Sequence, residues 1–322
     1  MKTLIKYVWG FSFVFLLFPV SIIAGEEVGL SSKTPSTFTE IMKNPQRSYK
    51  KYDELVIKGI HIKRGFFNNA EATKLIVSKS LIERVNMSSF NSVNTVYSDS
   101  AFNRSRLSYA VMPDIQISNV DFSRSIINNA DFSDAEISNS SFVRANLSSI
   151  VMDDATIDYT DFTNTRLSYA DLSGAVLNNN IFTDCSCNNI NLSGSEVGNN
   201  VFIDAILSST DFSKAEVLKS DFSEATLSYS DFSKSEISES NFTNGIVNNV
   251  DFSKSEINGV DFSNANLGSA DFSNSKLTSV NFENATLSYA NFNGAEFEDV
   301  NINGAVINSV SALGAKNSPF DM

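Results

Sequence analysis

Four aspartates recur at intervals of twenty residues, and paired carboxylates can act as the general acid and base on a glycosidic bond or hold a divalent ion. They are Asp211, Asp231, Asp251 and Asp271. A basic and an acidic series run beside them with the same spacing: Lys214, Lys234, Lys254, and then Glu216, Glu236, Glu256. Series of alternating sign are typical of a solvated surface that compensates its own charge. The sequence therefore favours a surface role over catalysis or metal binding.

Histidine and cysteine are too scarce to build a site of their own. The chain has one histidine, His61, and a metal or His-based catalytic site needs partners that it lacks. We expect His61 to be a surface residue. Cys185 and Cys187 fall where the repeat described below directs side chains inward, so we expect buried free thiols, with a bond between the two as the alternative. We predict that the protein is not an enzyme and has no cofactor or metal.

A short apolar period organises the chain from about residue 101. In ten-residue blocks such as "DFSKSEISES" and "DFSNANLGSA", the second residue is Phe, the seventh is Leu, Ile or Val, and the fifth and tenth are mostly small. An apolar centre every five residues fits neither the period of a helix nor the alternation of a strand. It does fit a square coil with five residues per side, in which each centre and the small residue two before it point inward.

This pattern resembles that of the pentapeptide-repeat family, namely a small residue, Asp or Asn, Leu or Phe, and two variable residues. The resemblance covers roughly residues 50–310; it is weaker before residue 100, as at Ala72 and Ser92, and Val or Ile replaces the small residue at positions such as Ile150 and Val250. It implies an all-β fold, a right-handed quadrilateral parallel β-helix with twenty residues per coil and about 13 coils.

Residues twenty apart should then stack, so each wall of the coil should keep one character. The wall that we call the Phe wall should bury an unbroken stack of Phe102, Phe122, Phe142, Phe162, Phe182, Phe202, Phe222, Phe242, Phe262 and Phe282. The opposite, mixed wall has Met, Leu and Phe centres from Met112 to Phe292. The Leu wall (centres Leu107 to Leu287) and the Ile wall (centres Ile117 to Leu277) lie between them, and the filled interior should leave no room for a cofactor.

The two ends of the chain differ from the repeat. Lys2 and Lys6 precede an apolar run that ends at Ala24, so residues 1–24 are predicted to be a signal peptide. The mature protein should begin near Gly25 and be exported, to the periplasm, the cell surface or the medium. If the segment is not cleaved, it would be the protein's contact with a membrane. We assign residues 25–46 to an N-terminal cap with a short helix, 47–310 to the β-helix and 311–322 to a C-terminal cap.

The charge of the chain is unevenly placed. Its formal net charge is −13, but residues 67–322 carry fourteen basic and thirty-two acidic side chains, a net charge of −18. Such a surface repels phosphate backbones, so we do not expect direct nucleic-acid binding. The family includes acidic DNA mimics that bind and protect DNA gyrase. This alternative function applies if the N-terminal segment is not a cleaved signal, because gyrase is cytoplasmic.

One outward column has a sixty-residue rhythm. Two residues after the centres of the Leu wall, Tyr, Asn and Ser recur in rotation from Tyr49 to Tyr289. We predict a binding face formed by Tyr109, Tyr169, Tyr229, Tyr289, Arg106, Arg166, Ile126 and Ile246. The alternative is that the rhythm only records the duplication of a segment. Outward positions of the Phe wall vary instead in blocks, such as Arg104, Arg124 and Arg144 followed by Asp184 and Asp204.

These expectations combine into one function. We predict an exported, non-catalytic rod that acts as a scaffold for an unknown protein or an envelope glycan in the cell envelope or outside the cell. Self-association through a second copy of the rod is a further expected mode.

Overall fold

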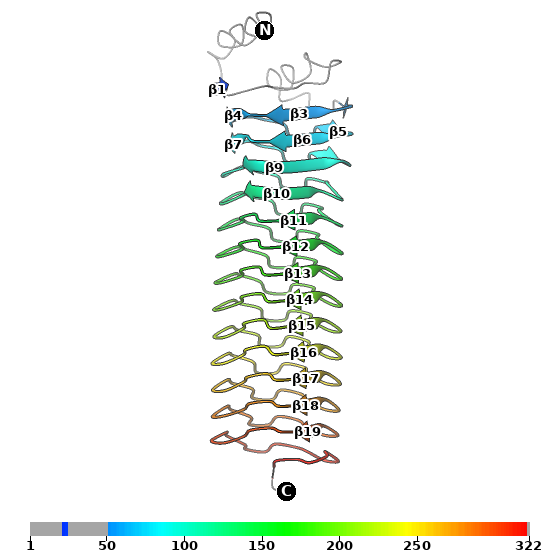
Figure 1. The fold of residues 1–322 in the computed structure, drawn as a ribbon, viewed down its shortest axis with the longest axis vertical. Helices are drawn as coiled ribbons and strands as arrows, with labels where there is room; N and C mark the ends of the chain where they lie inside the picture. Colours follow the sequence, from blue (N-terminus) through cyan, green and yellow to red (C-terminus); the bar gives the residue numbers. More distant parts are fainter. Residues whose placement is uncertain (1–20, 25–50, 321–322) are drawn as a thin grey trace, which may run out of the picture.

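The chain forms a long rod in which the polypeptide coils about 12 times around one axis, in the computed structural model that describes residues 21–24 and 51–320 (Figure 1). The fold class predicted from the sequence is confirmed, with about 12 turns where about 13 were expected. The predicted N-terminal helix and residues 1–20 of the predicted signal peptide lie outside the described residues. Over the described ranges, no helix is long and apolar enough to span a membrane.

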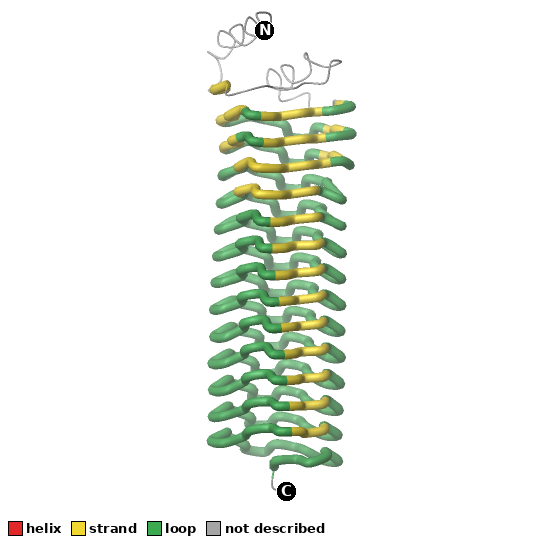
Figure 2. Tube along the Cα trace, in the orientation of Figure 1, coloured by secondary structure: helices red, strands yellow, loops and turns green. Residues whose placement is uncertain are grey.

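Strands are longest in the first turns (Figure 2). In chain order these are β1 (Ser21–Ala24), β2 (Lys51–Tyr52), β3 (Leu55–Lys58), β4 (Ile60–Lys63), β5 (Glu71–Ala72), β6 (Leu75–Ser78), β7 (Leu81–Glu83), β8 (Asn91–Ser92), β9 (Thr95–Ala101) and β10 (Gln116–Asp121). Three-residue strands on the Ile wall follow, namely β11 (Glu136–Ser138), β12 (Thr156–Asp158), β13 (Val176–Asn178), β14 (Glu196–Gly198), β15 (Glu216–Leu218), β16 (Glu236–Ser238), β17 (Glu256–Asn258), β18 (Lys276–Thr278) and β19 (Glu296–Glu298).

Every parallel pairing joins residues twenty apart. Ile117 pairs with Ile137, for example, and Ile137 pairs with Ile157. The later turns of the other three walls pair through single bridges such as Asp211 to Asp231, which is why Figure 2 draws them mostly as loop. One pairing is antiparallel: β1 lies against β4. Since β1 is the last part of the predicted signal peptide, cleavage near Gly25 would remove this strand.

The corners of the coil have a left-handed backbone. From Tyr97 onward, the residue two after each centre has a positive φ, between 46° and 65° for all residues other than glycine. Its N–H donates to a carbonyl of the next coil, as in the bond of 3.0 Å from Asn129 N to Ser148 O. A left-handed conformation costs an ordinary residue about 1–2 kcal/mol. Asn, Asp and Gly tolerate it best, and they occupy many of these corners.

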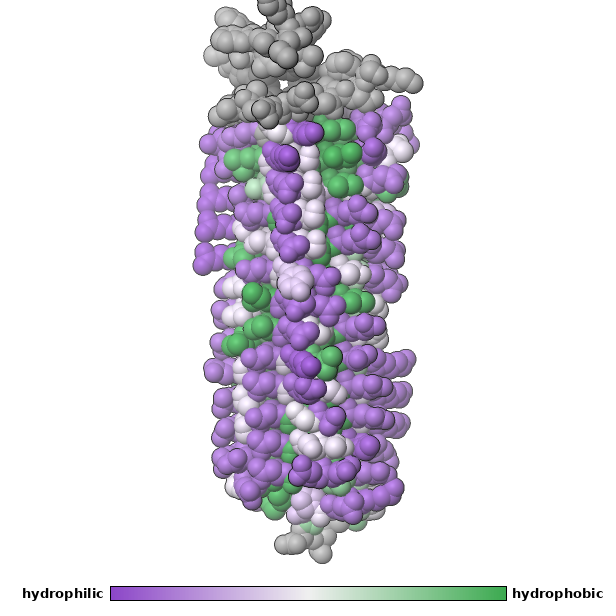
Figure 3. All heavy atoms as spheres, in the orientation of Figure 1, coloured by the Kyte–Doolittle hydropathy of each residue, from purple (hydrophilic) through white to green (hydrophobic). Residues whose placement is uncertain are grey.

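Stacked aromatic rings run through the interior beside the aliphatic side chains, whereas the face of the rod in Figure 3 is mostly hydrophilic. The ten Phe side chains of the Phe wall are all buried, and consecutive rings are stacked with centroids 4.6–5.3 Å apart. From Phe212 to Phe292 the mixed wall is also Phe, and its rings meet the Phe wall edge to face, as in the contact of 6.0 Å and 83° between Phe212 and Phe222. Both geometries are favourable for aromatic pairs.

An aromatic side chain from outside the two stacks lies at each end of the aromatic part of the core. At one end the Tyr97 ring lies 4.6 Å from the Phe102 ring, its hydroxyl donates to Met112 Sδ at 3.4 Å, and burial raises the pKa of Tyr97. At the other end the Phe320 ring lies 5.0 Å from the Phe292 ring. Tyr97 lies between the Phe stack and the earlier coils, and Phe320 covers the rings of the last coils.

Two asparagines lie inside the core, at inward positions that elsewhere are Ser, Thr or apolar. Asn180 Nδ2 donates to Ile157 O at 2.8 Å, and Asn180 Oδ1 accepts the Thr160 N–H at 2.9 Å. Asn200 makes the same two bonds one coil later, to Leu177 O and from Asn180 N. Buried amides of this kind are tolerated because their donors and acceptors are paired.

The two cysteines are joined, so the expectation of free thiols was wrong. Cys185 and Cys187 form a disulfide between Cα atoms 5.5 Å apart, and both side chains are buried. The reason is local. Residues two apart on one side of the coil both point inward, which brings the two sulfur atoms together at an ordinary Cα separation for a disulfide.

Candidate binding face

The aspartate series has a structural role at the corners of the mixed wall. The Oδ1 atoms of Asp211, Asp231, Asp251 and Asp271 each accept the backbone N–H of the serine two residues later, at 2.7–2.8 Å. The carboxylates therefore hold the turns of their own coils. Among the described residues, no three His, Cys, Asp or Glu side chains are grouped so that they could hold a metal ion.

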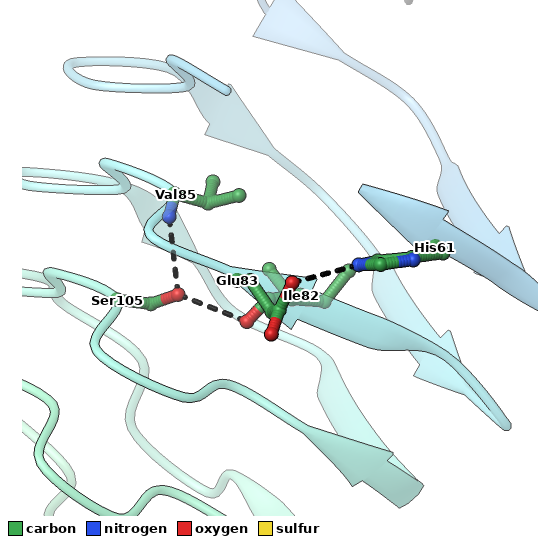
Figure 4. A network of polar contacts seen from close by, with 5 residues as sticks. All are labelled: His61, Ile82, Glu83, Val85 and Ser105. Atoms are coloured by element: carbon green, nitrogen blue, oxygen red, sulfur yellow. Dashed lines mark hydrogen bonds and ion pairs between the residues drawn. The ribbon is translucent and has the colours of Figure 1, made fainter. Parts of the chain in front are cut away.

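His61 is half-buried and has a partner on the next coil (Figure 4). Its Nε2 lies 2.9 Å from Glu83 Oε2, and this contact holds the pKa of Glu83 below its ordinary value. Below the pair, Ser105 Oγ accepts the Val85 N–H and donates to Ile82 O, which fixes the coil that carries Glu83. Sequence reasoning did not foresee this pair, because the two residues are 22 apart and not in one column.

We expect the His61–Glu83 contact to stabilise the fold at neutral pH and to weaken on acidification. Because the pKa of Glu83 is lower in the folded chain, the stabilisation is complete above the unfolded pKa and is lost as the pH falls through the folded pKa. An NMR titration of the Glu83 carboxyl carbon should show the low pKa, and His61→Ala should raise it. An equal pKa in both proteins would contradict this assignment.

The structure places the four predicted tyrosines in one row. Tyr109, Tyr169, Tyr229 and Tyr289 lie at corners of the Leu wall, three coils apart, and their side chains are 60–69% exposed. At the strand spacing of about 4.8 Å, neighbouring tyrosines are about 14 Å apart. Tyr49, which could extend the row, lies outside the described residues.

All four tyrosines have a left-handed backbone conformation, with φ between 60° and 65°. Their N–H groups donate to the next coil like those of other corners, for example from Tyr169 N to Asn188 O at 3.0 Å. Bulky residues rarely have positive φ values, and Asn or Ser occupies the same column in the coils between them. The backbone of the four tyrosines is thus strained, although their rings are not buried.

The other predicted residues lie on the same wall, one residue before its centres. Arg106 and Arg166 are exposed, Ile246 is 45% exposed and Ile126 is half-buried. Arg106 and Ile126 pair directly across neighbouring coils. The structure therefore brings the eight predicted residues to one wall, as a row of tyrosines beside a column of arginines and isoleucines.

Sequence reasoning missed a polar column next to the tyrosines. The residue before each corner follows the same rotation: Ser before Tyr, Asn before Asn and Ser before Ser, with Gly268 as the exception between residues 108 and 288. Ser108 Oγ donates to Asn128 Oδ1 at 2.7 Å, and Ser228 makes the same bond to Asn248. Comparing residues twenty apart at the position just before each corner would have revealed this column in the sequence.

The sequence analysis also missed Tyr159, which is 63% exposed on the opposite Ile wall.

Comparisons with known proteins identify the repeat. The family model described as "Pentapeptide repeat region" matches residues 195–272 and 237–311, and "Pentapeptide repeats (8 copies)" matches residues 115–154 and 160–196. No curated protein sequence matches the chain.

Solved structures similar to this chain include two pentapeptide repeat proteins from photosynthetic organisms. HetL, involved in heterocyst differentiation regulation in the cyanobacterium Nostoc sp. strain PCC 7120, is 19% identical over 71% of this chain and 90% of its own, with a TM-score of 0.40. The protein from the Arabidopsis thaliana thylakoid lumen is 22% identical over 37% of this chain and 72% of its own, with a TM-score of 0.17.

A third similar structure is QnrB1, a plasmid-mediated fluoroquinolone resistance protein. It is 15% identical over 66% of this chain and 91% of its own, with a TM-score of 0.28. Since all three TM-scores are below 0.5, the family assignment depends on the matched repeats.

Proposed function

Because this chain belongs to the pentapeptide-repeat family and its rod has a core filled by side chains, we propose that it is an exported, non-catalytic scaffold that binds an envelope glycan along its Leu wall. The observation that carries the proposal is the row of Tyr109, Tyr169, Tyr229 and Tyr289.

The tyrosines have a backbone cost that no packing offsets. A left-handed conformation costs about 1–2 kcal/mol per residue, and these rings are exposed and add nothing to the core. Asn189 and Ser209 form the same corner in the coils between them without a bulky side chain. Strained residues that the fold does not require are concentrated at binding sites. Tyrosine also suits such sites, because its ring has an apolar face and a polar tip.

The spacing fits a long, regular ligand better than a compact one. Four tyrosines at intervals of about 14 Å form a row about 43 Å long. A glycan offers sugar rings with apolar faces for tyrosine and hydroxyl groups for the Asn and Ser side chains between them. Arg106 and Arg166 add two positive charges. Several weak contacts along one ligand reinforce each other through effective concentration.

Export is part of the proposal and is supported by Lys2, Lys6 and the apolar run that ends at Ala24. Mass spectrometry of the protein from its native host should find a mature N-terminus near Gly25 in an envelope or secreted fraction. An intact Met1 in a soluble cytoplasmic fraction would contradict export and would favour the gyrase-binding alternative.

The binding face is tested by changing all four tyrosines to asparagine, the residue that the column uses elsewhere. We expect an equal or higher Tm, because the strain at the corners is relieved, and at least about a tenfold loss of affinity for envelope glycan fractions. Single changes such as Tyr169→Asn should have much smaller effects, since the remaining contacts persist.

Tyr159→Asn is the matched control, because it removes an exposed tyrosine with a φ of 48° from the opposite wall. Its glycan affinity should equal that of the unmodified protein. Equal glycan binding by the fourfold variant would contradict the binding face and leave the sixty-residue rhythm as a record of duplication. Binding of the unmodified protein to purified DNA gyrase, unaffected by the tyrosine changes, would support the DNA-mimic alternative instead.

A further inference from the structure

A column of charges at one corner of the Phe wall changes sign along the rod. It consists of the residues two after each Phe centre and the matching residues of the first coils. We call it the charged column: Arg64, Arg84, Arg104, Arg124, Arg144, Asn164, Asp184, Asp204, Glu224, Asn244, Asn264 and Asn284. Five arginines are thus followed by one neutral residue and three acids. The arginine part lines a groove with a volume of about 560 Å³.

The six charges of the column nearest Asn164 lack a partner in the described part of the chain. All charged side chains of the column are exposed, and none of them forms a side-chain hydrogen bond or an ion pair there. Farther from Asn164, Arg84 lies close enough to Glu83 to interact with its charge. Neighbouring like charges are separated by about 4.8 Å, the spacing of the coils, and repel one another. Ion pairs do form elsewhere between successive coils, such as Lys51 with Glu71 and Lys219 with Glu239.

The column is complementary to itself when it is reversed about Asn164. One coil before Asn164 is Arg144 and one coil after it is Asp184; two coils away are Arg124 and Asp204, and three coils away are Arg104 and Glu224. We propose that two copies of this chain associate side by side and antiparallel through this column, about a two-fold axis at Asn164. Arg144 then faces Asp184 of the partner subunit. The two-fold axis generates each of the three pairings twice, once from each copy, so that six ion pairs form over about 29 Å.

A second copy fits the column better than a linear polyanion does. A polyanion on the arginines would meet Asp184, Asp204 and Glu224 if it continued along the rod, and residues 67–322 as a whole have a net charge of −18. A second copy has the same coil spacing by construction, so its charges remain in register over all six pairs. Arg64 and Arg84 would face the neutral Asn264 and Asn244 of the partner subunit.

The surroundings of the column suit a protein contact. Each corner N–H donates to the next coil, as from Arg124 N to Val143 O at 3.0 Å and from Asp184 N to Ile203 O at 3.1 Å, so the backbone is fixed. On the Phe-wall side of the column, the residues near Asn164 are uncharged: Val143, Thr163, Thr183 and Ile203. On the Leu-wall side Arg166 is exposed two residues after Asn164, so the two copies have to meet through the column and its Phe-wall side.

Charge reversal in two separate variants tests the pairing. One variant carries Arg104→Glu, Arg124→Glu and Arg144→Glu, and the other carries Asp184→Arg, Asp204→Arg and Glu224→Arg. Each variant alone places like charges opposite each other. We expect the unmodified protein to sediment as a dimer at low ionic strength, and each variant alone to be a monomer with at least a tenfold weaker self-association. An equimolar mixture should form a heterodimer, because both halves of the interface are then complementary.

A cysteine at the two-fold axis tests the geometry. Asn164→Cys should give a dimer linked by one disulfide under mild oxidation, because residue 164 faces its own copy. Asn264→Cys is the matched control: it lies in the same column, is exposed and has a similar φ, but is about 24 Å from the axis along the rod. It should give no linked dimer. The native cysteines are buried in their own disulfide and should not interfere.

Further outcomes decide the proposal. High salt should dissociate the dimer, because about 1 M salt shortens the screening length to about 3 Å, whereas the fourfold tyrosine variant should dimerise like the unmodified protein. A monomeric unmodified protein at low salt, a mixture that stays monomeric, or equal linking of both cysteine variants would overturn it. Monomers whose binding to a sulfated polymer is lost only in the arginine variant would show that the column holds a polyanion instead.

Discussion

Replacing Phe222 with alanine is expected to lower the free energy of unfolding by about 3–5 kcal/mol. Its ring is fully buried and stacks between Phe202 at 4.6 Å and Phe242 at 4.7 Å. It also meets the edges of Phe212 and Phe232 on the mixed wall, at 6.0 and 6.5 Å. The interior cannot collapse into the space left behind, because the backbones above and below are fixed at the coil spacing by hydrogen bonds. Urea unfolding followed by circular dichroism measures the change.

Phe142→Ala is the matched comparison. Phe142 is equally buried and stacked on both sides, at 5.1 and 5.2 Å, but the described residues give it no edge-to-face ring on the mixed wall. Since an aromatic pair adds about 0.5–1.5 kcal/mol beyond burial, Phe142→Ala should cost less than Phe222→Ala. A loss below about 1 kcal/mol for Phe222→Ala would mean that the ring is not stacked inside.

Asn180→Ala is expected to lower the free energy of unfolding by about 2–4 kcal/mol. The change leaves the Thr160 N–H and the Ile157 carbonyl without their partners in the core, and each such loss costs about 1–3 kcal/mol. Asn180→Ser should cost less, because Ser140 in the same column accepts the Val120 N–H from the coil before it. Chemical denaturation measures both changes. Equal stability of the alanine and serine variants would show that the hydrogen bonds are not the cause.

The walls of the rod could be predicted because their cause is local and repeated. One apolar centre every five residues, with the same residue type at every twentieth position, leaves few other ways to bury Phe222 and its nine counterparts. The positions of Tyr109 and Arg106 on one wall follow from the same count. The left-handed corners were not predicted, since Arg, Lys, Tyr and Ser occur there as well as Asn and Gly.

Features that depend on one pair of side chains were harder to predict. The Cys185–Cys187 bond depends on two inward neighbours meeting in a narrow core, and the sequence alone left both outcomes open. The contact of His61 with Glu83 crosses from one column to another, so column counting did not reveal it. The period places Tyr97 inward, twenty residues before Ile117, but does not tell that its ring packs on Phe102; Phe320 lies after the last repeat, where the period gives no signal.

The coil and the tyrosine column give the rod two different units of length. A change of twenty residues adds or removes one whole coil and leaves every buried ring above a like residue, so the fold tolerates it as a step of about 4.8 Å. The Tyr, Asn and Ser of the Leu wall return only after sixty residues, or about 14 Å. A relative longer by one coil would keep the same interior and break the tyrosine row, whereas one longer by three coils would keep both. The interior of the rod therefore repeats with every coil, whereas the tyrosine row on its surface repeats only with every third coil.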